Sequence, residues 1–327
     1  MNYLGNRQYP ALLGESLFPE VKRNSLRLDM IKGAKKVPVI ASVHAFDTEA
    51  EIGSREATKD MLELALIKRK LPMSEEDIVA LENPRTPAEQ QYLMSQVFND
   101  FEFLVNGVKA RVELMRMEVL ASGTVTLDEN NLKATLNYGV PAENKEILSG
   151  TDLWSDPTSD PLEQMLAWYS GMAIKPKRVL TSLKVLATLL RHPKVVSALY
   201  GSFNTSRIAS RAELNNYLTQ LELPTIAVND AVYRKEVSKG VYEQRRYFPE
   251  DKFVMLPDGP LGETVYGPTA EEIRLSRNPQ VDITKVGNIL AMVYEENKDP
   301  VTTYTKAVAT ALPSFPVADE VFQAKVL

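Results

Sequence analysis

The most regular pattern of apolar residues along the chain runs from Pro87 to Leu120 and has the period of an α-helix. These residues recur at steps of three or four, as the residues on one face of a helix do. They are Leu93, Val97, Phe101, Leu104, Val108, Val112, Met115 and Val119. Thr86 and Glu89 supply a capping box at its start, and Ser122-Gly123 ends it. The pattern predicts a rod on the order of 50 Å long. Such a rod is more typical of a scaffold than of a catalytic element, and an ordinary long core helix is the alternative.

Two stretches before this helix alternate in the way that β-strands do. The first covers residues 37–46, and the second covers residues 61–71, with Leu64 and Leu66 on one side. The segment between them, 47–56, is strongly charged. We expect the two stretches to form a long two-stranded projection. Because a lone hairpin is marginally stable in water, this projection should pack on a neighbouring molecule or on the long helix.

After the long helix, the pattern changes to short elements of both kinds. A predicted strand pair, 124–127 with 132–136, precedes a boundary at residues 150–157. Predicted helices then start at Asp160-Pro161 and cover 182–191 and 211–221, and predicted strands cover 177–181, 225–228, 241–246, 252–256, 289–294, 301–312 and 317–326. We expect 241–246 to pair with 252–256. The order predicts two α+β units, with the tail strands returning to the first.

The composition excludes several classes of protein. The chain has 327 residues, a formal net charge of −5 and no cysteine. This charge offers no basic face for gripping nucleic acid tightly. Without cysteine there is no disulfide, thiolate metal site or cysteine nucleophile. No signal peptide and no membrane-spanning apolar run is present in the sequence, so we expect a soluble protein made in a cytoplasm.

The densest polar cluster consists of His44, Asp47, Glu49 and Glu51, with Arg55 nearby. A histidine and three carboxylates can bind a divalent metal. Their spacing, however, matches neither a helical pair nor a calcium loop, and the cluster falls at the predicted hairpin tip. We therefore interpret it as a solvated or intersubunit salt-bridge tip, and predict no metal site and no cofactor.

The other candidates for chemistry have structural explanations. His192 ends a predicted helix, where the helix dipole favours a cation. Trp154 and Trp168, with Tyr169, are predicted to fill the core of the second unit. The basic run 68–70 is interpreted as a solvated strand end. Because no motif has a spacing that catalysis requires, we predict that the protein is not an enzyme.

Stretches over nearly the whole chain carry a family resemblance. Residues 37–55, Val-Pro-Val-Ile-Ala-Ser-Val-His-Ala-Phe-Asp-Thr-Glu-Ala-Glu-Ile-Gly-Ser-Arg, are the most specific of them. The others are 17–22, 31–34, 137–141, Trp154-Ser155 with 160–163, 176–182, 253–259 and 314–326. The chain resembles the lambda-like phage major capsid protein E family, and residues 37–55 resemble the family's extended loop. The order of arm, hairpin, long helix, α+β domain and returning strands resembles the Hong Kong 97-type phage capsid fold.

The resemblance implies a shell subunit of the α+β class with four parts. These are an N-terminal arm (1–36), an extended loop (37–74), a peripheral domain (75–149 and 285–327, with the spine helix 87–120) and an axial domain (150–284). It further implies the major capsid protein of a tailed double-stranded DNA phage, which assembles into hexamers and pentamers of an icosahedral shell. That shell would enclose the genome without sequence-specific binding and without a membrane. Scaffold, portal and decoration proteins are further candidate partners, and the implied location is the virion head, assembled in the host cytoplasm.

We expect the extended loop to make the contacts between subunits. The candidate contact residues are Val39, Val43, His44, Asp47, Glu49, Glu51, Arg55, Leu64, Leu66, Lys68 and Arg69. Burial of apolar surface contributes roughly 25 cal/mol per Å², and many modest contacts add up over a shell. We predict that Glu49, Glu51 and Arg55 make charge contacts between subunits.

Three alternative functions belong to different classes. An encapsulin-like nanocompartment shell has the same type of fold and would bind a cargo peptide instead of enclosing a genome. A metal-dependent hydrolase built on His44, Asp47 and Glu49 would require stoichiometric metal. A monomeric binding module would remain a single small species in solution.

Overall fold

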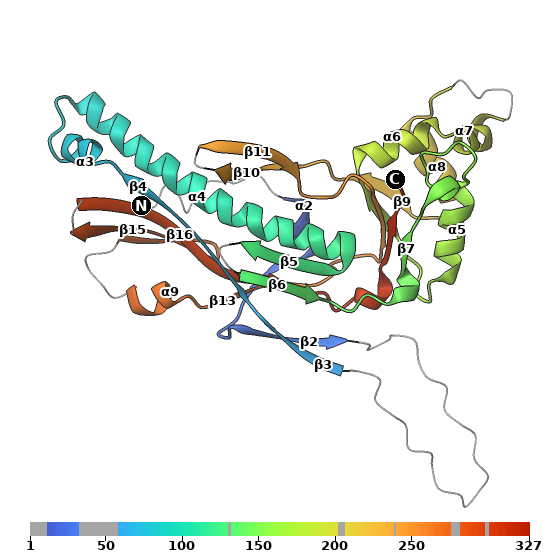
Figure 1. Ribbon diagram of the computed structural model, residues 1–327, viewed down its shortest axis with the longest axis horizontal. Coiled ribbons are helices and arrows are strands. Elements are labelled where there is room, and N and C mark those ends of the chain that lie inside the picture. The colour runs from blue at the N-terminus through green and yellow to red at the C-terminus, as the bar shows by residue number, and fades with distance from the viewer. Residues whose placement is uncertain are drawn as a thin grey trace, which may run out of the picture. The chain divides into compact units, whose positions relative to one another are not determined.

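The computed structural model describes residues 12–32, 58–129, 132–201, 207–238, 240–275, 282–297 and 301–327. The chain forms two compact units, each assembled from segments that are distant in sequence. Unit 1 consists of Met1–Leu28, Met61–Arg116 and Glu263–Ser314, and unit 2 of Asp29–Asp60, Met117–Gly262 and Phe315–Leu327. Both contain helices and strands (Figure 1), as the prediction of an α+β protein requires. The predicted division into arm, extended loop, peripheral domain and axial domain stays a prediction.

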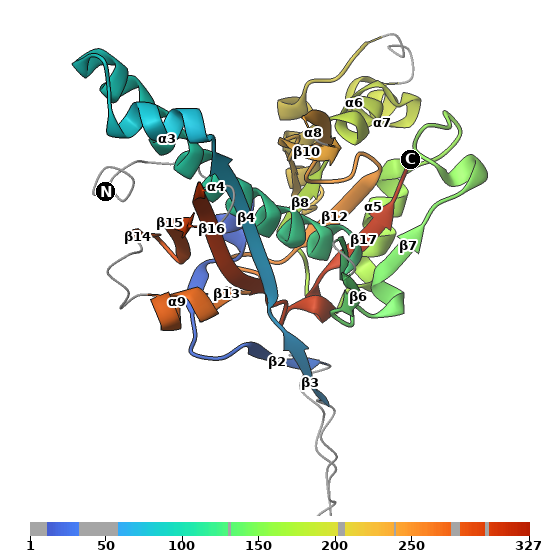
Figure 2. The same ribbon diagram turned by 60° about the vertical axis from the view of Figure 1, so that its left-hand side comes forward.

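A six-stranded sheet forms the centre of unit 1. Its strands follow the order β1 (Glu20–Lys22), β13 (Thr264–Gly267), β16 (Val301–Pro313), β15 (Ile289–Asn297) and β14 (Asp282–Val286), and β4 (Ala65–Met73) also pairs with β16. Figure 2 shows β4 running alongside β16. β1 and β13 are parallel, whereas the other pairs are antiparallel. The long strand predicted at 301–312 is therefore the strand on which this sheet is built.

Within the described residues, unit 1 also contains three short helices, and a separate strand pair precedes β4. α9 (Ala270–Leu275) packs Leu275 against the buried residues Leu290, Met292 and Val308 of the sheet. α2 (Leu13–Leu17) and β1 belong to unit 1, and α3 (Glu75–Glu82) follows β4 with Ser74 as its N-cap. β2 (Arg27–Lys32) and β3 (Thr58–Glu63) form a two-stranded sheet.

α4 (Pro87–Ser122) is the predicted long helix. Thr86 Oγ1 accepts the Glu89 N–H at 3.1 Å, which confirms one half of the predicted capping box, while the Glu89 carboxylate accepts the Arg85 N–H instead of that of Thr86. The predicted stripe is half-buried at Leu93 and Val97 and fully buried from Phe101 onward. The helix ends at Gly123, whose φ of +71° is a left-handed conformation that glycine adopts without strain. Among the described residues, no helix combines the length and the apolar character that crossing a membrane requires.

Unit 2 contains a five-stranded sheet with a core of aromatic residues. The strand order is β7 (Lys145–Ile147), β17 (Phe322–Lys325), β12 (Lys252–Leu256), β8 (Arg178–Thr181) and β9 (Thr225–Val228). The helices of this unit are α5 (Pro161–Gly171), α6 (Leu183–Arg191), α7 (Pro193–Tyr200) and α8 (Arg211–Gln220). Trp154 and Trp168 are buried against Phe253 and Phe322 of the sheet, and Tyr169 packs at the edge of the same cluster. The predicted role of the two tryptophans as core residues is therefore confirmed.

Two antiparallel strand pairs complete unit 2. The first joins β5 (Thr124–Glu129) to β6 (Leu132–Asn137), as predicted. The second joins β10 (Val232–Ser238) to β11 (Val241–Arg246), with a register shift near Glu236. Lys235 Nζ lies 2.8 Å from Glu129 Oε1, so an ion pair links the two strand pairs.

Two predicted pairings are wrong, and a third cannot be compared because one of its strands lies outside the described residues. Residues 65–73 pair with β16, and 58–63 pair with 27–32, whereas the predicted partner segment, 37–46, is not among the described residues. β11 pairs with β10, while β12 lies between β8 and β17. β17 closes the sheet of unit 2 and does not return to the sheet of unit 1. In each case the pattern identified a strand, but period-2 alternation specifies only the faces of a strand and not its partner.

Candidate assembly surface and buried ionic network

The predicted contact residues that the structure describes lie in or next to β4. Along this strand, half-buried and exposed residues alternate, with Leu66, Lys68 and Lys70 on the exposed face. Leu66 is an apolar side chain that remains 54% exposed. The exposed face of β4 therefore presents Leu66, two lysines and Pro72 to the surroundings of unit 1.

Leu64 and Arg69 are partly engaged within the subunit. The Leu64 N–H donates to the Leu26 carbonyl oxygen at 2.9 Å. Its side chain lies so near Gly267 that a Cβ there would be 2.6 Å from Leu64 Cδ1. The guanidinium carbon of Arg69 lies 5.2 Å from the centre of the Phe103 ring on α4, an arrangement that a cation–π attraction favours. The basic run 68–70 thus lies in the interior of a strand rather than at its end, although Lys68 and Lys70 are exposed, as the sequence suggested.

A shallow groove of about 260 Å³ lies over the exposed face of β4 and is called the β4 groove below. It is lined by Lys68, Arg69, Lys70, Tyr294 and Lys306. Lys70 Nζ lies 3.8 Å from the centre of the Tyr304 ring, and Tyr304 stacks on Tyr294. The groove therefore combines cations with aromatic rings.

Two carboxylates lie at the rim of the β4 groove. Glu271 Oε1 lies 2.5 Å from Lys306 Nζ, and Glu296 Oε1 lies 3.9 Å from Lys70 Nζ. Burial alone would raise the pKa of Glu271, but the hydrogen bond and charge of Lys306, with the charge of Lys68, hold this pKa below its usual value. The groove is thus an environment that stabilises carboxylates in their ionised form.

The remaining predicted contact residues lie outside the described residues. They are Val39, Val43, His44, Asp47, Glu49, Glu51 and Arg55, and the candidate metal cluster is among them. In the part of the chain that the structure describes, no group of three histidine, aspartate or glutamate side chains could hold a metal ion.

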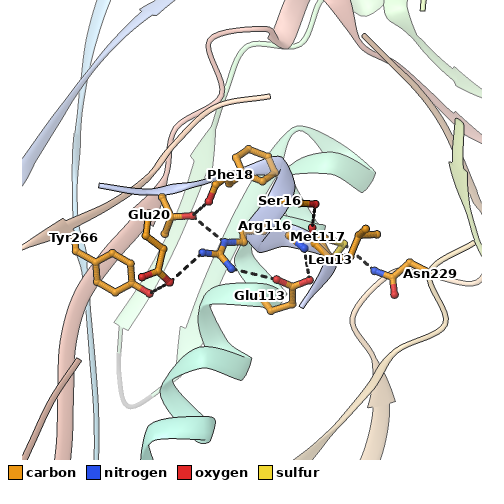
Figure 3. A network of polar contacts seen from close by, with 11 residues as sticks. Leu13, Ser16, Phe18, Glu20, Glu113, Arg116, Met117, Asn229 and Tyr266 are labelled. Atoms are coloured by element: carbon orange, nitrogen blue, oxygen red, sulfur yellow. Dashed lines mark hydrogen bonds and ion pairs between the residues drawn. The ribbon is translucent and has the colours of Figure 1, made fainter. Parts of the chain in front are cut away.

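A buried ionic network, which the sequence pattern did not reveal, connects α2 and β1 to α4 and β13 in unit 1 (Figure 3). Glu113 and Arg116, one helical turn apart on α4, are each about 1% exposed. Glu113 Oε1 accepts the Gly14 N–H at 2.9 Å, and Glu113 Oε2 lies 3.3 Å from an Arg116 terminal nitrogen. The short helix α2 is thereby attached to the long helix through a charged hydrogen bond.

The guanidinium of Arg116 extends the network toward β1 and β13. Its Nε donates to Thr264 Oγ1 at 2.8 Å, and Thr264 Oγ1 in turn donates to the Phe18 carbonyl oxygen. Another terminal nitrogen lies 3.5 Å from Glu20 Oε1, which also accepts the Tyr266 hydroxyl at 3.0 Å (Figure 3). Residues 13–20 are therefore held in unit 1 by one buried cation.

Burial raises the pKa of the Glu113 carboxyl, although the Gly14 N–H and the Arg116 guanidinium act in the opposite direction. Burial also raises the pKa of Tyr266, with the Glu20 carboxylate acting the same way. The network is thus built from groups that lose much of their hydration, so each member depends on its partners. A signal was present in the sequence, because Glu113 and Arg116 are charges one turn apart inside the apolar stretch 112–121.

His192 ends α6, as predicted, and also begins α7. It is buried, and its Nδ1 accepts the Lys194 N–H at 3.3 Å as the N-cap of α7. Its Nε2 lies 3.0 Å from the Asp156 carbonyl oxygen. The ring therefore accepts a hydrogen bond at the start of α7, and the same residue ends α6 as its C-cap.

The fold is shared with phage capsid proteins of known structure. A prophage protein of E. coli CFT073, described as a capsid protein, matches with a TM-score of 0.56 and 15% identity over 83% of this chain and 80% of its own. A phage-related protein of Bordetella bronchiseptica RB50 matches with a TM-score of 0.54 and 13% identity over 99% of this chain and 94% of its own. The chain therefore has the same fold as these two proteins.

The family follows from the sequence comparisons. A major capsid protein of Pseudomonas phage JBD67 is 36% identical over 90 residues, and the match covers 28% of this chain and about 28% of that relative's length. The profile of the phage major capsid protein E family matches residues 5–326, so the chain belongs to this family. It is a structural capsid protein and not an enzyme. The predictions of the family, of the α+β capsid fold and of a non-catalytic function are confirmed.

Proposed function

We propose that copies of this chain assemble into hexamers and pentamers that tile the icosahedral head of a tailed double-stranded DNA phage. Membership of the phage major capsid protein E family over residues 5–326 is the observation that carries this proposal. Because a shell is made of many identical contacts, modest surfaces such as the exposed face of β4 suffice through multivalency. Assembly takes place in the host cytoplasm, with scaffold, portal and decoration proteins as further candidate partners.

The genome is enclosed without sequence-specific binding. With a formal net charge of −5, a subunit does not attract the DNA backbone as a whole. A weakly repelled genome can slide along the inner wall when it enters and leaves. This expectation also separates the proposal from a shell that captures its contents through a dedicated binding site.

The proposed contacts between subunits come from the extended loop, residues 37–74, and the base of this loop is described. Leu66 and Lys68 are exposed there, whereas Leu64 and Arg69 already have contacts inside the subunit. We therefore assign the stronger share of the contact between subunits to Leu66 and Lys68 among the four described candidates.

The test is the size of the purified protein, measured by negative-stain microscopy together with light scattering. Closed particles of tens of nanometres, or rings of five and six subunits, are the expected result. A monomer that forms no ring at any concentration, even with a scaffold protein or a crowding agent present, would contradict the proposal and support a monomeric binding module. An encapsulin-like shell would instead yield particles that contain a cargo protein and no packaged DNA.

A further inference from the structure

The β4 groove carries an excess of positive charge within unit 1. Three lysines, Lys68, Lys70 and Lys306, line it, and the two carboxylates at its rim, Glu271 and Glu296, pair with Lys306 and Lys70. Among the described residues, Lys68 forms no ion pair, although its charge acts on Glu271. The groove therefore has room and charge for additional carboxylates.

The same unit exposes an acidic face on α3. Glu75 and Glu76 are exposed in the first turn of this helix, and neither forms an ion pair within the described part of the chain. Val79, one turn further along, is 63% exposed. Because residues three and four apart share one side of a helix, Glu75, Glu76 and Val79 form a single surface, which is called the α3 face below.

The order of chemical types along the two surfaces matches. On β4, Leu66 is followed on the same face by Lys68 and Lys70, at roughly 7 Å intervals. On α3, Val79 is separated from Glu75 and Glu76 by roughly 5–6 Å. With Leu66 on Val79, both glutamates lie within side-chain reach of Lys68, and Lys70 is the more distant of the two lysines.

We propose that the β4 groove of one subunit binds the α3 face of a second copy of this chain. The two surfaces are different, so the contact is heterologous, the type that generates rings and larger closed assemblies. This inference rests on the proposed function, since it names a pair of surfaces that join subunits of the shell. Lys68 and Lys70 bind the carboxylates of Glu75 and Glu76, and Leu66 packs on Val79.

Nucleic acid fits the same groove less well. A DNA strand presents one negative charge about every 3.4 Å, so a backbone crossing the groove would pass close to Glu271 and Glu296. The start of α3 presents its carboxylates within a single helical turn, which suits a groove of about 260 Å³. Charge complementarity therefore favours a second copy of the chain.

The experiment uses charge reversal in the full chain. One variant carries Lys68→Glu with Lys70→Glu, a second carries Glu75→Lys with Glu76→Lys, and a third carries all four changes. Each of the first two should reduce the yield of particles at least about tenfold, because a small loss per contact is multiplied over a shell. The third should recover the yield to within about twofold, because the complementary charges are restored. Lys68→Glu alone, which breaks no ion pair among the described residues, gives a smaller loss in the same direction.

The matched control is Lys133→Glu with Lys194→Glu, two exposed lysines of unit 2 that give the same change in net charge. Its particle yield should equal that of the wild type. Normal assembly of both reversal variants, or no recovery in the fourfold variant, would overturn the inference. The proposed function would still stand in either case, provided that the wild type forms shells. Normal shells that retain less DNA in the Lys68→Glu, Lys70→Glu variant would overturn it in favour of a nucleic-acid site. A wild type that forms no shells would instead contradict the proposed function.

Discussion

Residue by residue, the packing around the buried ionic network leaves little freedom. Gly14 is the residue with the least space for a side chain. Its backbone N–H donates to Glu113, and its Cα faces the paired side chains of Glu113 and Arg116. The same network is where the sequence pattern was least informative. A glutamate and an arginine one turn apart on a helix usually indicate a solvated face, and here they lie in the middle of a buried one. Their burial depends on α2, β1 and β13, and the helical period of residues 87–120 does not indicate that these elements cover the helix.

Replacing Gly14 by alanine should destabilise the subunit by about 1–3 kcal/mol. The new Cβ would lie 2.4 Å from Glu113 Oε2 and 2.7 Å from Arg116 Cδ, and both side chains are held by other contacts. The matched control is Gly107→Ala in α4, where a Cβ meets nothing within 4 Å. This control should be neutral or stabilising by roughly 0.5–1 kcal/mol. Denaturant unfolding of unassembled subunits measures both, and equal stability of the two variants would contradict the prediction.

Replacing Arg116 by methionine should destabilise the subunit by about 3 kcal/mol at pH 8 and by less at acidic pH. Without the guanidinium, the ionised Glu113 carboxylate remains buried and unpaired. The pKa of Glu113 is already raised by burial in the folded wild type. A folded pKa above the unfolded value means that the native state binds more protons, so stability is gained as the pH falls through the folded pKa and lost as it rises.

Adding Glu113→Gln to Arg116→Met should therefore restore part of the lost stability at pH 8 and remove most of the extra pH dependence. Chemical denaturation of both variants between pH 5 and pH 8 tests this. The proposed cause would be wrong if the single variant showed the same loss of stability at every pH.

At the scale of elements, the structure shows which sequence patterns are sufficient to predict a helix or a strand and which are not. The helix predicted at 87–120 is observed as Pro87–Ser122, because a long apolar stripe with a cap and a terminal glycine specifies an element without reference to its neighbours. β13 was missed because its four residues lie between prolines and glycines and are too short for a period to appear. The partner of β11 was wrong because pairing depends on contacts distant in sequence, and β10 was itself not predicted.

The cap of α8 should make the stability of unit 2 depend on acid. Ser210 Oγ and the Glu213 carboxylate form a capping box, and hydrogen bonds from the Ser210 side chain and backbone lower the pKa of Glu213 to about 2. A folded pKa below the unfolded value means that the stabilisation is present above the unfolded pKa of 4.5 and is lost as the pH falls toward 2. Glu213→Gln should thus unfold at a lower temperature than the wild type near neutral pH, and the two should converge toward pH 2. The unfolding temperatures are measured by circular dichroism, and a constant difference over this range would contradict the assignment. The control is Glu143→Gln, which makes the same change at an exposed site.

For the whole molecule, the family and the fold were readable because the order of the elements and the stretch 37–55 together are specific to one type of capsid protein. The surfaces proposed to join subunits were harder to predict from the sequence. Lys68 and Arg69 are adjacent in sequence, yet one is exposed and the other lies over Phe103, since neighbouring strand residues face opposite sides of a sheet. The sequence predicts which segment carries the contacts between subunits, whereas the sheet decides which of its described residues are exposed.

Replacing Glu49, Glu51 and Arg55 together by alanine should impair assembly or lower the thermal stability of the shell. We expect these charges to form contacts between subunits, and each lost contact is repeated over the assembly. Particle yield and shell melting temperature are the measurements. The control removes two acids and one base elsewhere, with Glu143→Ala, Glu163→Ala and Lys133→Ala on exposed sites of unit 2. Heads of normal yield and unchanged melting temperature in the loop variant would rule the prediction out.

The position of β17 in unit 2 has a consequence for how a subunit is made. This strand, Phe322–Lys325, lies between β7 and β12, so the sheet remains split until residues late in the chain have been translated. The aromatic cluster around Trp168 and Phe253 is likewise incomplete without Phe322. A chain cut short before Phe322 would therefore leave β7 and β12 without the strand that joins them, and its unit 2 should not fold.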